Sequence, residues 1–140
     1  LVVMAFLAIQ FTSAKDVVTK DEMQLPLAAR NFITQHFATP QISYIMIESE
    51  LPKGKKFEAV LTSGVEIEFD SKGDWTDVDC KRGTVTASIV PDYVKDYVNA
   101  NFSGQKITQI ERDRHGIEVE LANDLSIKFD KKGQLRRLDD

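Results

Sequence analysis

The sequence contains few of the residues that catalytic, metal-binding or disulfide-stabilised proteins require. Its 140 residues include a single cysteine, Cys80, and two histidines, His36 and His115. One cysteine cannot form a disulfide within the chain, and two separate histidines lack the paired spacing of a zinc site. Neither a phosphate-binding glycine loop nor a GxSxG nucleophile motif occurs. We therefore expect no cofactor and no enzymatic activity. Cys80 is interpreted either as a part-buried, idle thiol or as a link between two chains.

Clusters of basic residues are missing as well. The chain has 18 Lys and Arg against 22 Asp and Glu, a net charge of −4, and Arg136-Arg137 is the nearest approach to a basic run. Nucleic-acid-binding proteins usually carry a basic patch or stripe, so we exclude nucleic acid as a partner. The composition, 42% hydrophobic and 29% charged, is typical of a globular protein.

The first 14 residues, LVVMAFLAIQFTSA, carry no charge and are almost wholly apolar as far as Phe11. A helix needs roughly 20 apolar residues to span a bilayer, so this stretch is too short. An apolar run that closes with small residues before a charged segment is typical of a signal peptide and its cleavage site. We predict residues 1–14 to be a signal-peptide remnant, although a buried strand or helix is the alternative. The mature protein would be periplasmic or secreted, with no stable membrane span after cleavage.

Residues 15–24 are strongly charged and lack a sustained hydrophobic period, which predicts a flexible leader. After this leader, residues 57–73 and 117–133 resemble each other under a shift of 60. Seven positions are identical: Glu58/Glu118, Leu61/Leu121, Ile67/Ile127, Phe69/Phe129, Asp70/Asp130, Lys72/Lys132 and Gly73/Gly133. Apolar and polar residues alternate within each segment. This period of two predicts antiparallel strands with one face on a core and the other towards water.

An amphipathic helix is predicted before each of these segments. Pro26 and Pro91 suit the first turn of a helix, where a missing N–H costs nothing. The apolar stripes that follow are Ala29, Phe32, Ile33 and Phe37 in one case, and Val94, Tyr97, Val98 and Phe102 in the other. The pattern predicts an α+β fold of two tandem repeats, residues 25–80 and 89–140, joined by a linker at 81–88. Each repeat would be a helix packed on a four-stranded antiparallel sheet. Because a unit of that size buries only a marginal core, the two should continue as one extended sheet.

The polar side of the predicted sheet is the candidate interaction face. Its members are Glu58, Val60, Glu66, Glu68, Glu118, Glu120 and Lys128. Catalytic carboxylate pairs need unequal environments, which a row of carboxylates on an open sheet face does not provide. The face is therefore interpreted as a docking surface, or alternatively as a simply solvated surface.

A second acidic group invites a calcium hypothesis. Asp70, Asp74, Asp77 and Asp79 lie close together in the sequence. Calcium takes about six oxygen ligands from a loop that surrounds it, and Gly73 serves a hairpin turn here instead. A solvated turn is the simpler interpretation, and a metal is not expected.

The pattern as a whole resembles the exported PepSY-like, β-lactamase-inhibitor-like family of Bacteroidetes. The residues that carry the resemblance are Leu25-Pro26, Val90-Pro91, Phe37, Phe102, Ile42, Ile45, Ile107, Ile110 and the segments 66–75 and 126–135. The resemblance implies a tandem helix-on-sheet fold in a periplasmic or secreted protein with no established activity. We predict an exported, non-enzymatic module that binds an unknown protein or peptide, with inhibition as one outcome of binding. The alternative is a small-ligand or calcium-responsive periplasmic sensor. The oligomeric state is not indicated.

Overall fold

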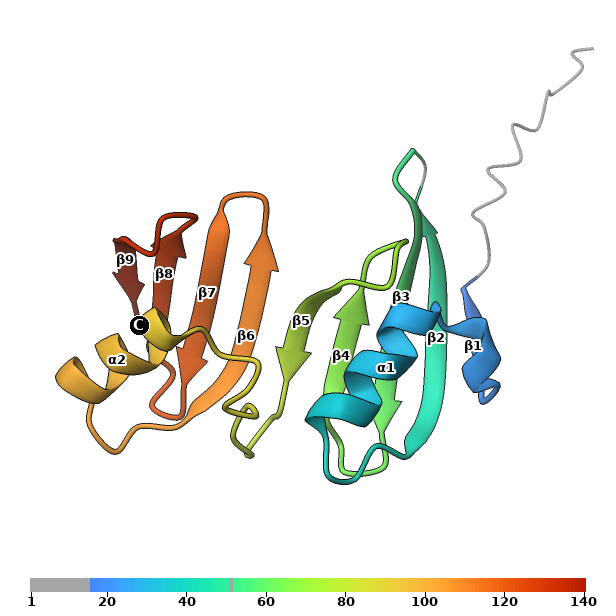
Figure 1. Cartoon of the computed structure of the whole chain (residues 1–140), viewed down its shortest axis with the longest axis horizontal. Coiled ribbons are helices and arrows are strands. Elements are labelled where there is room, and N and C mark those ends of the chain that lie inside the picture. The colour runs from blue at the N-terminus through green and yellow to red at the C-terminus, as the bar shows by residue number, and fades with distance from the viewer. Residues whose placement is uncertain (1–15, 51) are drawn as a thin grey trace, which may run out of the picture.

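The computed structural model describes residues 16–50 and 52–140, and within them the strands form one antiparallel sheet of nine (Figure 1). The strands lie side by side in their order along the chain, so each is hydrogen-bonded to the one before it and the one after it. They are β1 (Val17–Thr19), β2 (Ile42–Glu50), β3 (Gly54–Leu61), β4 (Glu66–Phe69), β5 (Trp75–Asp79), β6 (Ile107–Asp113), β7 (Gly116–Leu121), β8 (Ser126–Asp130) and β9 (Leu135–Asp139).

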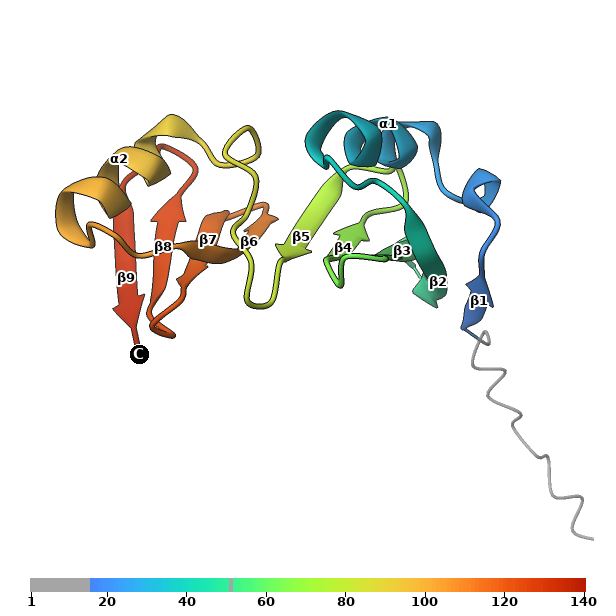
Figure 2. The same cartoon turned by 90° about the horizontal axis from the view of Figure 1, so that it is seen from below.

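Two α-helices in the described residues, α1 (Leu27–His36) and α2 (Asp92–Asn101), pack on one face of this sheet. A short 3₁₀ turn, η1 (Glu22–Gln24), precedes α1. Figure 2 shows both α-helices on the same side of the strands, and no described helix lies on the other side. None of the helices in the described part of the chain is long and apolar enough to cross a membrane. The helix-free side of the sheet is called the open face below.

The helices form where the sequence predicts them. Pro26 and Pro91 occupy the N-cap positions, and each helix then runs for ten residues. Ala29 and Ile33 of α1, and Val94 and Val98 of α2, are the buried residues of their helices. Their spacing of four residues places each pair on one helix face, which is the face that packs on the sheet.

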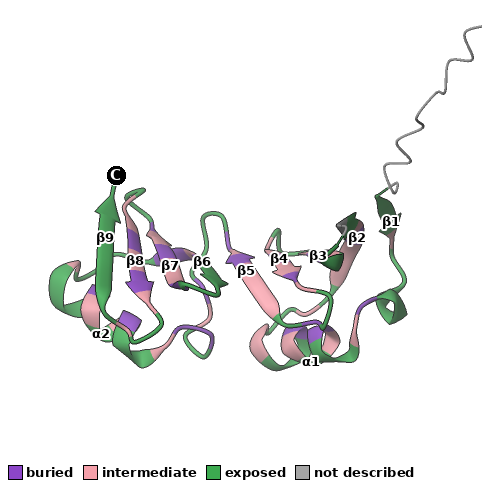
Figure 3. Cartoon of the chain, turned by 90° about the horizontal axis from the view of Figure 1, so that it is seen from above, coloured by how far each residue is buried: buried purple, intermediate pink, exposed green. Residues whose placement is uncertain are grey.

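Aromatic rings join each helix to the sheet. Phe32 of α1 lies edge-on to Phe69 of β4, with ring centroids 5.8 Å apart. Tyr93 and Tyr97 of α2 lie edge-on to Phe129 of β8 at 5.6 and 5.5 Å. Both phenylalanines are fully buried in a single apolar cluster that spans the helix-covered side of the sheet (Figure 3). The rows that the alternation predicts to face the core therefore do so.

The predicted division of the fold into two four-stranded repeats is nevertheless wrong. The sequence predicts two repeats, each a helix packed on four antiparallel strands, that continue as one extended sheet. The described residues instead form a single sheet of nine strands with two short helices. The strands do not separate into fours, because β1 adds to the edge of β2 and β5 pairs directly with β6. Only the broad α+β class remains correct.

The segment expected to be a flexible leader contains regular structure, namely β1 and the 3₁₀ turn η1. Val17, Val18 and Thr19 form β1 opposite Ile47, Met46 and Ile45 of β2. Here the structure differs from the predicted flexible leader, because the main-chain groups of β2 provide partners that local sequence does not reveal. The predicted signal-peptide remnant at 1–14 lies outside the described residues.

The predicted linker at 81–88 is held to the sheet along part of its length. The Cys80 N–H donates to the Thr108 carbonyl at 2.9 Å, and the Val85 N–H donates to the Ile107 carbonyl at 2.8 Å. Val85 is also 3% exposed, as part of the core. These contacts extend the junction between β5 and β6 beyond the strands themselves.

Candidate functional site

Side chains on the open face form continuous rows, because residues directly opposite each other on neighbouring strands share a face. One row consists of five carboxylates opposite one another in turn, and we call it the acidic row. Its members are Glu58, Glu68, Asp77, Glu111 and Glu118, from β3 to β7. Met46 precedes this row on β2, and Lys128 and Arg137 continue it on β8 and β9.

A second row lies beside the first, two residues along each strand. We call it the flanking row, and its members are Tyr44, Val60, Glu66, Asp79, Gln109, Glu120, Ser126 and Asp139. The centre of the open face is thus strongly acidic, whereas its two ends are apolar and mixed in charge. Like charges directly opposite each other on a sheet repel, so the acidic row lowers the stability of the folded state.

Six residues of the predicted interaction face lie in these two rows, and the seventh, Lys128, continues the acidic row on β8. Glu58, Val60, Glu66 and Glu68 lie on β3 and β4, and Glu118, Glu120 and Lys128 lie on β7 and β8. The structure connects the two groups through residues that the sequence analysis did not assign to the face. These are Asp77 and Asp79 of β5, and Gln109 and Glu111 of β6. The pairing of β5 with β6 is long-range, so no local pattern identifies them as neighbours of the predicted residues.

Cations neutralise only part of the acidic surface. Lys56 Nζ lies 3.1 Å from Glu68, and Lys81 Nζ lies 3.0 Å from Glu66 and 2.9 Å from Asp79. Hydrogen bonds to Asp79 and Glu66 raise the pKa of Lys81 above its usual value. The side chains in these pairs are between a quarter and half exposed, so each pair contributes little to stability.

Asp77 is the most perturbed carboxyl group of the acidic row. Burial raises its pKa to about 7, and the charges of Glu111, Glu68 and Asp79 act in the same direction. The Gln109 side-chain amide opposes this shift by donating to both carboxylate oxygens, at 3.1 and 3.0 Å. Burial also raises the pKa of Glu58, with Glu66 and Glu68 contributing. Asp77 and Glu58 therefore bind protons more readily than isolated carboxylates would.

A cleft of about 360 Å³ opens on this face where β5 and β6 diverge. The two strands pair at only three positions, Asp77 to Asp79 against Gln109 to Glu111. Beyond them the strands are bridged by Arg112, whose Nε donates to the Trp75 carbonyl at 2.7 Å. The lining combines three cations with four carboxylates: Lys56, Glu68, Thr76, Glu111, Arg112, Asp113, Gly116, Ile117, Glu118 and Lys128. Such a surface can form ion pairs with groups of either sign.

The aspartates considered for calcium do not form one site. The Asp70 carboxylate accepts hydrogen bonds from the backbone N–H groups of Lys72 and Asp74 and so closes the β4–β5 turn. Asp77 and Asp79 lie on the open face instead. Within the described residues, no group of three or more His, Cys, Asp or Glu side chains could hold a metal ion.

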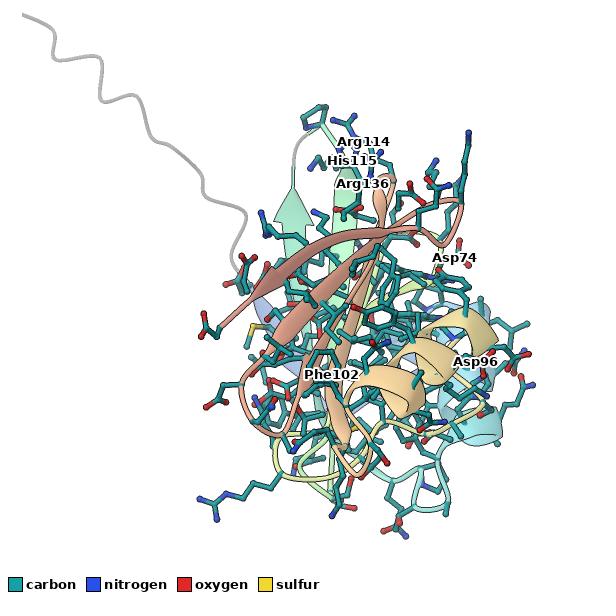
Figure 4. The ribbon with its side chains drawn as sticks, turned by 90° about the vertical axis from the view of Figure 1, so that its left-hand side faces the viewer. Asp74, Asp96, Phe102, Arg114, His115 and Arg136 are labelled. Atoms are coloured by element: carbon teal, nitrogen blue, oxygen red, sulfur yellow. The ribbon has the colours of Figure 1, made fainter. Side chains whose placement is uncertain are left out.

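The histidines and the cysteine are separate from the open-face rows. His36 Nδ1 is hydrogen-bonded to Ser88 Oγ at 2.8 Å, and His115 lies with Arg114 in the β6–β7 hairpin (Figure 4). Cys80 is a free thiol and only 8% exposed, and burial raises its pKa to about 11. None of the three therefore offers an activated nucleophile or base to the open face.

Comparison with known proteins finds one matching family and several similar structures. The model of the PepSY-like family, described as beta-lactamase-inhibitor-like, matches residues 55–137. A solved structure from Bacteroides vulgatus, described as a periplasmic protein of unknown function, is 40% identical with a TM-score of 0.86. The match covers 90% of this chain and 100% of that one. A comparison with curated proteins finds none that matches.

Two further structures are similar to the same extent. One, also from Bacteroides vulgatus and described as periplasmic, is 36% identical with a TM-score of 0.84, covering 90% of this chain and 98% of that one. The other, from Bacteroides thetaiotaomicron, is described as periplasmic and calcium-regulated. It is 37% identical with a TM-score of 0.84, covering 89% and 97%. The family resemblance and the periplasmic or secreted location predicted from the sequence are thereby confirmed.

Proposed function

The chain belongs to the PepSY-like, beta-lactamase-inhibitor-like family, and we propose that it is an exported, non-enzymatic module that binds a protein or peptide on the open face of its sheet. The proposed partner contacts residues of the acidic and flanking rows. Inhibition of the partner is one consequence that such binding can have. The family description rests on likeness to an inhibitor, and fold alone does not define function, so the proposal rests on the face itself.

One observation carries this proposal: a broad polar face left uncovered by the two helices. The opposite face is covered by the helices and an apolar core, which leaves the open face as the uncovered side of the sheet. Most of its carboxylates on β3, β4, β5 and β7 are half-buried beside one another, whereas Glu111 on β6 is exposed. The cleft near the junction of β5 and β6 makes this surface uneven and gives a partner a depression to fill. Proteins commonly recognise each other through such patterns of charge.

The test is binding by the mature chain, immobilised and exposed to the periplasmic extract of its native host. Two matched variants are needed. The open-face variant carries Glu58→Gln, Glu66→Gln, Glu118→Gln and Glu120→Gln, and the control carries Gln35→Ala and Asp96→Asn on exposed helix positions. We expect one or a few proteins to bind the wild type and the control but not the open-face variant. Equal binding by all three, or no binding at all, would remove the proposal.

A calcium-responsive sensor is the second candidate, and one observation favours it. The Bacteroides thetaiotaomicron relative, 37% identical, is described as calcium-regulated. Isothermal titration calorimetry with CaCl₂ distinguishes the two candidates, since the sensor predicts heat and a shift in melting temperature at millimolar calcium. An absence of both would remove this candidate and leave the docking proposal unaffected.

A further inference from the structure

The outer edge of β9 is a surface distinct from the open face, although Asp139 of this strand also belongs to the flanking row. β9 is the last strand of the sheet, and within residues 16–50 and 52–140 no strand pairs with its outer side. Viewed from that end, β9 and α2 lie nearest the viewer, with Arg136 on the strand (Figure 4). We propose that two copies of the protein associate through this edge. Their β9 strands would pair antiparallel about a two-fold axis at Leu138.

Apolar side chains at this edge are more exposed than their counterparts on β5. Val78 lies opposite Ile67 and is fully buried, whereas Leu138 lies opposite Ile127 and is 44% exposed. The difference follows from β6, which covers the outer edge of β5. Leu135 is 43% exposed and lies opposite Phe129, on which the 38% exposed Tyr93 packs. Within this chain, therefore, the edge of β5 that corresponds to the outer edge of β9 is covered by a strand.

The backbone of Leu138 is oriented to accept a partner strand. On β5 the Cys80 N–H donates outwards to Thr108, so Val78, two residues earlier, also directs its N–H and C=O towards β6. Leu138 on β9 is the equivalent of Val78 on β5, because the β8–β9 pair has its register shift at the same position as the β4–β5 pair. Its N–H and C=O therefore point away from β8. Two copies paired at Leu138 would exchange two N–H···O=C hydrogen bonds across the axis.

Charges on β9 match in this register. With Leu138 opposite Leu138 of the second copy, Arg137 lies opposite the second copy's Asp139, and the reverse pair is repeated across the axis. Both side chains belong to the open face, because Arg137 lies opposite Lys128 and Asp139 opposite Ser126. Within one chain Arg137 forms an ion pair with Asp139 of the same strand, and it also lies opposite the like charge of Lys128, which is unfavourable. A second Asp139 would offset that repulsion.

Other pairings of the edge lack this match. A two-fold register centred on Arg137 opposes two arginines, and one centred on Asp139 opposes two aspartates. The exposed edge at β1 is a competing partner for β9. Placing its Val17 opposite Leu138, so that both apolar residues share the core face, brings Asp16 against Asp139. Only the register centred on Leu138 pairs opposite charges and joins the exposed leucines.

The interface would be small, since one short strand from each copy contributes most of it. The two-fold axis runs through the sheet, so both α2 helices lie on the same side, above the exposed leucines. Association of this kind is weak and depends on concentration. Charge substitutions at two repeated pairs are expected to change the dissociation constant about tenfold or more.

Three variants and one mixture test the pairing by sedimentation velocity over micromolar to near-millimolar concentrations. The wild type should dimerise, and Arg137→Asp or Asp139→Arg should each raise the dissociation constant about tenfold, because each opposes like charges. The double variant, Arg137→Asp with Asp139→Arg, should restore dimerisation. An equimolar mixture of the two single variants should form a heterodimer, which a loss of folding could not produce.

Several results would overturn the proposal. A wild type that stays monomeric throughout the range excludes the dimer, provided that circular dichroism shows it folded. Dimerisation that is equally strong in the single variants shows that another surface is used. Association abolished by Val18→Lys on β1, but unchanged by the β9 variants, assigns the contact to the opposite edge. Failure of these experiments leaves the proposed binding on the open face intact.

Discussion

Arg112 contacts Trp75 in two ways at the junction of β5 and β6. Its guanidinium carbon lies 4.1 Å from the centroid of the indole ring, and its Nε donates to the Trp75 carbonyl at 2.7 Å. The indole in turn stacks on Phe32 of α1, with centroids 6.2 Å apart. One side chain of β6 is thus connected through β5 to the first helix, at the place where the two strands are no longer paired.

Arg112→Ala should lower the free energy of unfolding by about 1–2 kcal/mol, because it removes both the cation–π contact and the hydrogen bond. The neighbouring Arg114→Ala is the control and should change it by less than about 0.5 kcal/mol. Trp75 is the single tryptophan, so urea unfolding followed by its fluorescence measures both variants. Equal effects of the two substitutions would show that Arg112 does not stabilise the junction.

Asp77 should make stability depend on pH in the direction opposite to an ordinary salt-bridged aspartate. Burial raises its pKa from 3.8 to about 7 in the folded protein. The folded state therefore binds this proton more tightly than the unfolded chain does. Its contribution to stability is full below pH 4 and is lost as the pH rises to about 7.

Asp77→Asn should remove that loss. Relative to the wild type, the variant should gain about 1–2 kcal/mol between pH 4 and pH 8, a value reduced from the full shift because Asp77 is partly exposed. Chemical denaturation at several pH values measures the difference between the two proteins. Asp96→Asn, exposed on α2, is the matched control and should follow the wild type. A difference that stays constant with pH would contradict the assignment.

Phe129 should be among the most sensitive core positions. It is 1% exposed, and its ring contacts two tyrosine rings of α2 edge-on. Phe129→Ala would leave a cavity beneath the helix and cost about 3–5 kcal/mol. Leu135→Ala, on the strand opposite and 43% exposed, should cost less than about 1 kcal/mol. Thermal unfolding compares the two, and similar melting temperatures would argue against the packing of α2 on β8.

Gly116 should tolerate no side chain. Its φ is +150°, and an added Cβ would lie 2.0 Å from the Phe129 carbonyl oxygen. Gly116→Ala is expected to cost at least about 3 kcal/mol, since backbone must move to relieve the clash. Gly64 has a φ of +92° but open space around it, so Gly64→Ala should cost only about 1–2 kcal/mol of backbone strain. Urea midpoints of the two variants test this order, which the reverse ranking would contradict.

Cys80 should react slowly in the folded protein. Burial raises its pKa from 9.0 to about 11, which lowers the reactive thiolate fraction about a hundredfold near neutral pH. Alkylation by iodoacetamide at pH 8 should be about a hundredfold slower without denaturant than in concentrated urea. Equal rates in the two conditions would show that the thiol is accessible.

The sequence predicts the layered part of the fold well. Alternation around Phe57, Ile67, Val119 and Ile127 identifies which residues are buried, because side chains of a strand alternate between faces. The apolar residues around Ile33 and Val98 are equally informative, because apolar residues spaced three to four apart are typical of a helix that packs one face on a core. These signals are local, and each depends on residues a few positions apart.

What the sequence does not predict depends on distant pairing. β1 is three residues long, and its exposed Val17 and Val18 give it no apolar period of its own. The junction of β5 and β6 joins Asp77 to Glu111, and the register shift in β5 breaks the alternation there. For that reason the centre of the open face, including Asp77 and Glu111, follows only from the structure. The division into two four-stranded units failed for the same reason.

The order of the strands has a consequence for export. Each strand of the described residues pairs only with those next to it along the chain. Apart from the pairs β1–β2 and β5–β6, which a helix separates, the paired strands are joined by short turns. Local connections of this kind favour rapid folding. A chain that crosses a membrane from its amino end could therefore build its sheet strand by strand as it arrives. At each stage, the most recently added strand would have unpaired backbone groups on its outer side.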